Sequence, residues 1–249
     1  MRLKLISCEI LYREVCAAVA NSPNQVDIEF LTKGLHDAGS VPMRKTLQEA
    51  VDRAEQGGVR YDAVCLGYGL CGNGLVGLEA RGIPLVLPRA HDCITLFLGS
   101  KERYLDYFNS HPGVYFTTTG WLERADGSEL TQLMHREQGF GLSREELAAK
   151  YGEENADFLY EQLTKYTVSY RKFTFIEMGV EPDDRFERRT VEKARERGWE
   201  YEKIRGEMAL VRALVDGPWN ERDFLVVQPG SKIVARYDEG VVGTEPAAP

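Results

Sequence analysis

The sequence predicts an α/β fold, with a Rossmann-like, mainly parallel sheet flanked by helices and a second, smaller α/β lobe. Three observations support this prediction. Apolar, β-branched runs alternate with amphipathic helical runs along most of the chain. Segment 61–69, YDAVCLGYG, is apolar nearly throughout, as expected for a parallel strand covered on both faces. The length of 249 residues suits one large domain or two small ones.

The first lobe is expected over residues 1–124. Strands are predicted at 2–8, from Val26, and at 61–69, 83–88 and 113–121. Helices are predicted at 9–20, 46–58 and 99–110, with a short helix at 74–82 after a Gly-rich loop. Thr46 and Glu49 have the spacing of a capping box, and Gly57 and Gly58 end that helix.

A helical bridging segment is expected over residues 125–168, where the sequence becomes acidic and Ser143 and Glu146 form a second capping-box pattern. A second α/β lobe with a C-terminal tail is expected over 169–249. Its predicted elements are strands at 172–179, 199–206 and 223–230, helices at 183–198 and 207–217, and a loose tail from 238. The pattern leaves open whether this lobe extends the first sheet or forms its own.

Composition excludes several classes of protein. The net charge is −8 and no basic stripe is present, so we expect no nucleic-acid binding. No run approaches the roughly 20 apolar residues of a membrane span, and no signal peptide is predicted. We therefore expect a cytoplasmic protein with no membrane association. In that reducing compartment, the five cysteines are expected to be thiols or metal ligands instead of disulfides.

The Gly-rich loop is the first candidate for a binding function. Residues 67–72, GYGLCG, match the G-x-G-x-x-G pattern between a predicted strand and helix. In a dinucleotide fold such glycines let the backbone approach a pyrophosphate, and Asp92 follows at a distance suited to a ribose-binding acid. The glycines are equally explained as a tight turn, or as shaping a different ligand site. The candidate cofactor-binding residues are Gly67, Gly69, Gly72, Asn73 and Gly74.

The cysteines give the second candidate. Cys8 ends the first predicted strand, Cys71 follows the third, and His91 and Cys93 follow the fourth. Because the carboxyl ends of parallel strands share one edge, these four side chains are expected to meet there. Thiolates and imidazole suit zinc or an iron–sulfur cluster. Buried thiols and a reactive cysteine remain alternatives.

Arg89 is the third candidate. It stands with Asp92 in the motif PRAHDC, inside the stretch 61–100 that holds only five charged residues. Charges in apolar surroundings are expensive unless they are paired. The sequence therefore predicts either a structural pair between Arg89 and Asp92 or a role for Arg89 in binding an anionic group.

Four segments, SCEILYREV, GYGLCGNGL, PRAHDCITLFLGS and TTTGW, together resemble a family, domain of unknown function 1638. The resemblance extends over residues 3–235. It implies an origin in anaerobic bacteria or archaea. It also implies a link to corrinoid-dependent methyltransferases, because genes of the family lie near theirs.

Three functions are consistent with these observations. The first is a metal- or iron–sulfur-binding protein that acts on a small molecule or cofactor in corrinoid-linked methyl metabolism. The second is a metal-free enzyme or binding protein for a phosphorylated or nucleotide ligand. The third is a non-catalytic accessory protein that docks on a methyltransferase or corrinoid protein through the acidic helical segment.

Overall fold

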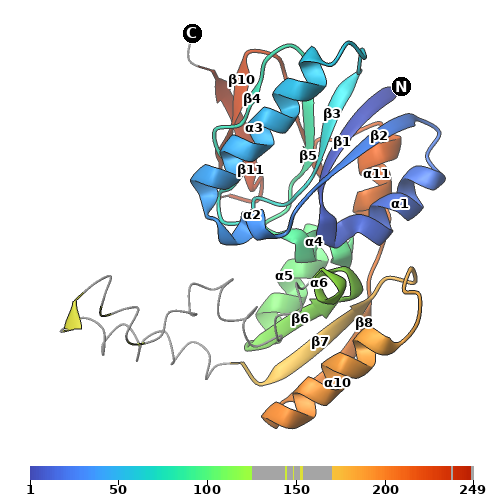
Figure 1. Cartoon of the computed structure of the whole chain (residues 1–249), viewed down its shortest axis with the longest axis vertical. Helices are drawn as coiled ribbons and strands as arrows, with labels where there is room; N and C mark the ends of the chain where they lie inside the picture. The colour runs from blue at the N-terminus through green and yellow to red at the C-terminus, as the bar shows by residue number, and fades with distance from the viewer. Residues whose placement is uncertain (125–143, 145–147, 149–151, 154–169, 237, 248–249) are drawn as a thin grey trace. The chain divides into compact units, whose positions relative to one another are not determined.

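The fold was examined in a computed structural model, which describes residues 1–124, 144, 148, 152–153, 170–236 and 238–247. These residues form two compact units (Figure 1). The first contains Met1–Asp106, Met178–Glu181 and Arg205–Pro249, and the second contains Tyr107–Glu177 and Pro182–Ile204. No helix in these described ranges is long and apolar enough to cross a membrane.

The first unit is built on a five-stranded sheet in the order β2-β1-β3-β5-β9. The strands are β1 (Arg2–Cys8), β2 (Gln25–Leu31), β3 (Ala63–Gly67), β5 (Leu85–Pro88) and β9 (Phe224–Val227). The first four are parallel, and β9 pairs antiparallel with β5. The prediction of a mainly parallel sheet flanked by helices is therefore confirmed.

Helices cover both faces of this sheet. Side chains alternate between the two faces along each strand, so neighbouring residues contact different helices. On one face, Ile6, Val64 and Leu66 form a core with α3 (Ser40–Gln56). On the other face, the Cys65 thiol contacts the Leu214 carbonyl of α11 (Ala209–Asp216) at 3.5 Å, and α1 (Tyr12–Ala20) packs beside α11 (Figure 1). Short helices η1 (Glu9–Leu11), α2 (Gly34–Asp37) and α4 (Cys93–Leu98) follow β1, β2 and β5.

The first unit contains a second sheet, in the order β11-β10-β4. Two sequence predictions are wrong in this region. Residues 74–82 form turns and the short strand β4 (Glu79–Ala80) instead of a helix, because β10 (Ser231–Ala235) pairs with β4. The expected loose tail contains β11 (Val242–Pro246), which pairs antiparallel with β10. The partner of β4 is distant in sequence, whereas β11 forms a hairpin with β10.

The second unit contains a three-stranded sheet in the order β6-β7-β8. Strands β6 (Val114–Thr118) and β7 (Lys172–Glu177) are parallel, and α10 (Arg185–Arg197) connects β7 to β8 (Glu200–Arg205). Aromatic rings of Tyr115, Phe173 and Phe175 form its core. The strand expected at 113–121 is too long, because the Thr118 hydroxyl accepts from the Trp121 N–H and starts α6 (Thr119–Glu123).

The two units do not follow the sequence boundaries expected at 124 and 168. Strand β6 shares its sheet with β7, while Arg205–Pro249 returns to the first unit. Helix α5 (Lys101–Ser110) includes the division between Asp106 and Tyr107. The expected bridging helices at 125–168 lie almost entirely outside the described residues.

Candidate functional site

The candidate site lies at the carboxyl edge of the parallel strands. Strand β1 has β2 on one side and β3 on the other, so the chain reverses its direction across the sheet between these two neighbours. In open α/β sheets, ligands bind in the crevice outside such a switch point. Cys8 ends β1, Gly67 ends β3, and the loop from Arg89 to Asp92 follows β5. Cys8 thus ends one strand of this edge, while Cys71, His91 and Cys93 follow two others.

Two loops of this edge are joined along their backbones. The Leu70 N–H donates to the Ala90 carbonyl at 2.8 Å, and the Cys71 N–H donates to the His91 carbonyl at 3.0 Å. A Cβ atom on Gly69 would lie 2.6 Å from the Cα atom of Asp92. Gly69 is therefore required because the loop after β3 packs directly against the backbone of the loop after β5.

Cys71 is the central thiol of this arrangement. Burial raises the pKa of Cys71 far above the ordinary thiol value, and the nearby charges of Asp92 and Cys8 raise it further. Backbone N–H groups of Gly69 and Cys93 donate to its sulfur and lower this pKa. Cys71 itself has a positive φ of 46°. The side chain is thus held between two loops, within electrostatic range of a second thiol and a carboxylate.

Tyr68 contributes a buried hydroxyl that sequence reasoning missed. The residue is only 3% exposed, and its hydroxyl has no hydrogen-bond partner among the described residues. Burial raises the pKa of Tyr68 well above its ordinary value, and the charges of Cys8 and Cys71 add to this effect. The hydroxyl is therefore a buried polar group in the loop that carries Cys71. The sequence feature that could have revealed Tyr68 is a large side chain with a hydroxyl group inside a loop of small residues.

Asp92 holds the start of α4. Its Oδ1 atom accepts from the N–H groups of Ile94 at 3.0 Å and Thr95 at 3.4 Å, and its Oδ2 atom accepts from the Tyr104 hydroxyl at 3.0 Å. Burial nevertheless raises the pKa of Asp92. The exposed His91 ring stacks on Tyr104, with ring centroids 6.0 Å apart. Charge on Cys93 raises the pKa of Tyr104, which places that thiol near the Tyr104 hydroxyl.

The remaining loop glycines are explained largely by packing. A Cβ atom on Gly67 would lie 2.3 Å from the Ser7 hydroxyl oxygen, and one on Gly74 would lie 2.2 Å from the Met43 sulfur. Gly72 and Asn73 have positive φ values of 62° and 68°. No helix follows directly, so the loop lacks the helix N-terminus on which a dinucleotide fold places its pyrophosphate. Cofactor contact by these residues stays a prediction.

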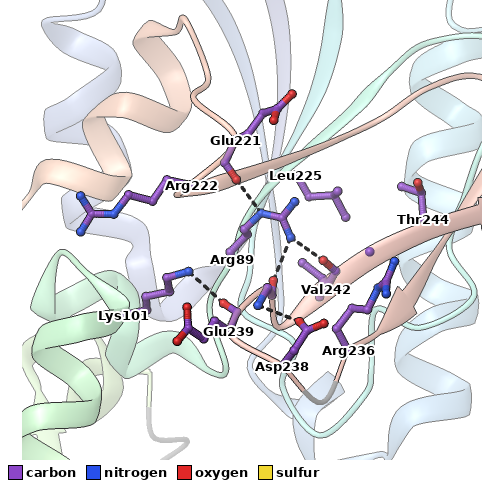
Figure 2. A pocket seen from close by; sticks show the side chains of 12 residues that line it. Arg89, Lys101, Glu221, Arg222, Leu225, Arg236, Asp238, Glu239, Val242 and Thr244 are labelled. Atoms are coloured by element: carbon purple, nitrogen blue, oxygen red, sulfur yellow. Dashed lines mark hydrogen bonds between the residues drawn. The ribbon is translucent and has the colours of Figure 1, made fainter.

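The Arg89 side chain contacts the C-terminal segment (Figure 2). Its Nε atom donates to the carbonyls of Glu221 at 2.8 Å and Phe224 at 3.2 Å. Its Nη1 atom donates to the carbonyls of Gly240 and Val242. The structural pair with Asp92 does not form, because these carbonyls occupy the guanidinium.

The described residues contain no group of three His, Cys, Asp or Glu side chains arranged to hold a metal ion. Charge on Cys8 raises the pKa of Cys71, and the His91 ring stacks on Tyr104. Metal ligation by Cys8, Cys71, His91 and Cys93 thus stays a prediction.

A family model described as "Protein of unknown function (DUF1638)" matches residues 30–215. The chain belongs to this family. The match confirms the resemblance seen in the sequence motifs, and it includes the Gly-rich loop and the loop from Arg89 to Cys93. Comparisons with curated proteins and with solved structures gave no match.

Cys65 lies inside β3, and we expect it to resist alkylation. It is fully buried in β3, and burial raises the pKa of its thiol to about 12. At pH 8, roughly one such thiol in ten thousand is ionised. After a short iodoacetamide pulse, mass spectrometry should find Cys65 unlabelled in folded protein and labelled in guanidinium. The partly exposed Cys16 serves as reference. Rapid labelling of Cys65 in the folded state would contradict this prediction.

Proposed function

We propose that this protein binds a thiophilic metal ion at the carboxyl edge of the first sheet and uses it on a small molecule or cofactor. Cys8 and Cys71 are the protein ligands. The observation that carries the proposal is the packing of the loop with Cys71 and the buried Tyr68 hydroxyl, which has no partner among the described residues, against the backbone of His91 and Asp92 at the edge where β1 ends in Cys8. Burial raises the pKa values of Cys71, Tyr68 and Asp92, and a bound cation would reverse that cost.

Soft thiolate ligands favour zinc, copper(I) or iron. A single ion fits the donor set better than an iron–sulfur cluster, because clusters are held by several thiolates at once. Catalytic zinc sites have three protein ligands and keep one position open for water or a substrate, so this site needs one ligand besides Cys8 and Cys71. His91 or Cys93 would supply a third ligand after a change of side-chain rotamer, since both belong to the loop that contacts Cys71.

The other two functions have less support. A nucleotide at the Gly-rich loop is disfavoured for two reasons. The backbone of Asp92 occupies the space beside Gly69, and no helix begins directly after the loop. An accessory role, with docking on a methyltransferase or corrinoid protein, depends on the acidic segment outside the described residues. The family resemblance supports the link to corrinoid-dependent methyl transfer.

Metal binding is tested with protein purified without oxygen. We expect one equivalent of Zn²⁺ or Cd²⁺ to bind, with ultraviolet thiolate–cadmium absorption and release of protons at pH 7.5. Loss of an outer-shell partner typically costs about 10- to 100-fold in metal affinity, so Cys71→Ser and Cys8→Ser should each cost more. Cys16→Ser, in α1, is the matched control and should bind as the wild type does.

Two results would contradict the proposal. One is a wild-type protein that stays folded and binds neither Zn²⁺, Cd²⁺ nor Fe²⁺. The other is an affinity unchanged in both Cys71→Ser and Cys8→Ser. Circular dichroism of each variant separates loss of the site from loss of the fold.

A further inference from the structure

A second pocket of about 480 Å³ lies in the first unit beside Arg89 (Figure 2). It is bounded by residues from the end of β5, the start of α5, the segment before β9 and the β10–β11 hairpin. Its volume lies within the range of small-molecule sites. Leu225 and Val242 give it an apolar part, and Thr244 adds a hydroxyl from β11.

The Arg89 guanidinium faces this pocket in a fixed orientation, and only some of its N–H groups have an acceptor. Its Nε and Nη1 atoms donate to four backbone carbonyls, which hold the group in one orientation. Its Nη2 atom has no acceptor among the described residues, and no described carboxylate lies within ion-pair distance. Carbonyl dipoles stabilise the charge without cancelling it. A guanidinium held in this way is preorganised to accept an oxyanion.

Two further cations of the pocket also lack a carboxylate partner within the described part of the chain. Arg236 lies across the backbone of Gly243, where a Cβ atom would approach its Nε atom to 2.6 Å. Lys101 donates from Nζ to the Glu239 carbonyl at 2.8 Å. By contrast, Arg222 is paired with Glu102 at 2.8 Å, and its side chain extends away from Arg89 (Figure 2).

Three acidic residues, Glu221, Asp238 and Glu239, also line the pocket. All three are exposed to solvent, where their repulsion of an anion is weak. Asp238 is turned into its own loop, since its Oδ1 atom accepts from the Gly240 N–H at 2.8 Å. The half-buried Arg89 therefore dominates the potential at the pocket wall.

We propose that this pocket binds a small molecule through an oxyanion, either a phosphate ester or a carboxylate, with Arg89 and Arg236 as the charged contacts. The Nη2 edge of Arg89 and the Arg236 guanidinium supply the hydrogen bonds to the oxyanion. Leu225 and Val242 contact the carbon skeleton of the ligand. This site is separate from the thiols of the proposed metal site and does not depend on them.

The test is calorimetric titration of inorganic phosphate and of malonate into the full chain at constant ionic strength. We expect at least one of the two probes to bind the wild type. Arg236→Gln should weaken that binding about tenfold or more, because a charge-assisted contact is lost. Arg222→Gln removes an equal charge from the pocket wall and should change the affinity less than about twofold, since Arg222 is already paired.

The identity of the probe that binds distinguishes a phosphate ester from a carboxylate ligand. Cys71→Ser should leave this binding unchanged, which separates the pocket from the metal site. The proposal is overturned if neither probe binds the wild type, or if Arg236→Gln and Arg222→Gln bind equally well. Circular dichroism and an unchanged urea midpoint for Arg236→Gln show that the fold is intact.

Discussion

Replacement of Arg89 by methionine is expected to lower the free energy of unfolding of the first unit by about 3 kcal/mol. Methionine keeps much of the apolar stem but donates no hydrogen bond. The carbonyls of Glu221, Phe224, Gly240 and Val242 would lose their donors, and these lie 132 to 153 residues away in sequence. Urea unfolding should show the lower midpoint, and hydrogen exchange should show lost protection in β11.

Arg222→Met is the matched control for this prediction. Arg222 also lines the pocket, but its ion pair with Glu102 is solvent-exposed, with side-chain exposures of 69% and 44%. Exposed pairs of this kind contribute less than about 1 kcal/mol. Equal destabilisation by the two substitutions would show that Arg89 does not hold the C-terminal segment, and would also remove the basis for its preorganised orientation in the pocket.

The parallel strands could be predicted because their signal is local. Segment 61–69 is apolar enough to be buried on both faces, segment 2–8 has a short strand pattern, and the structure places β1 and β3 side by side there. The arrangement of Cys8, Cys71, His91 and Cys93 at one edge then followed from the rule that parallel strands end together. No local pattern, however, showed which sheet β6 or β9 would join.

The failed predictions share a physical cause. Strand β11 lies in a segment rich in glycine, proline and acidic residues, so its own propensity for strand is weak. It forms because β10 supplies the ladder hydrogen bonds and Val242 is buried. The direction of Arg89 was equally unpredictable, since it depends on carbonyls far along the chain. Tyr68 was missed because a buried hydroxyl is recognised only after its surroundings are known.

Gly69→Ala is the second substitution for which a large effect is expected, about 3 kcal/mol of destabilisation. An added Cβ atom would lie 2.6 Å from both the Cα and carbonyl carbon atoms of Asp92, and 2.8 Å from its nitrogen. Because these are backbone atoms, no change of rotamer relieves the overlap. The loop after β3 must then separate from the loop after β5, and the hydrogen bonds from Leu70 and Cys71 break.

The glycines of the same loop provide the comparison that makes this prediction specific. Gly72 has a positive φ of 62° and no atom within 4 Å of an added Cβ, so Gly72→Ala should cost only about 1 kcal/mol of backbone strain. Thermal unfolding of the two variants should therefore rank Gly69→Ala well below Gly72→Ala. Gly69→Ala should also lose Cd²⁺ binding, because it moves Cys71 away from Cys8. If the two variants unfold at the same temperature, the close contact between these loops is absent, and the two-thiol site loses the packing that assembles it.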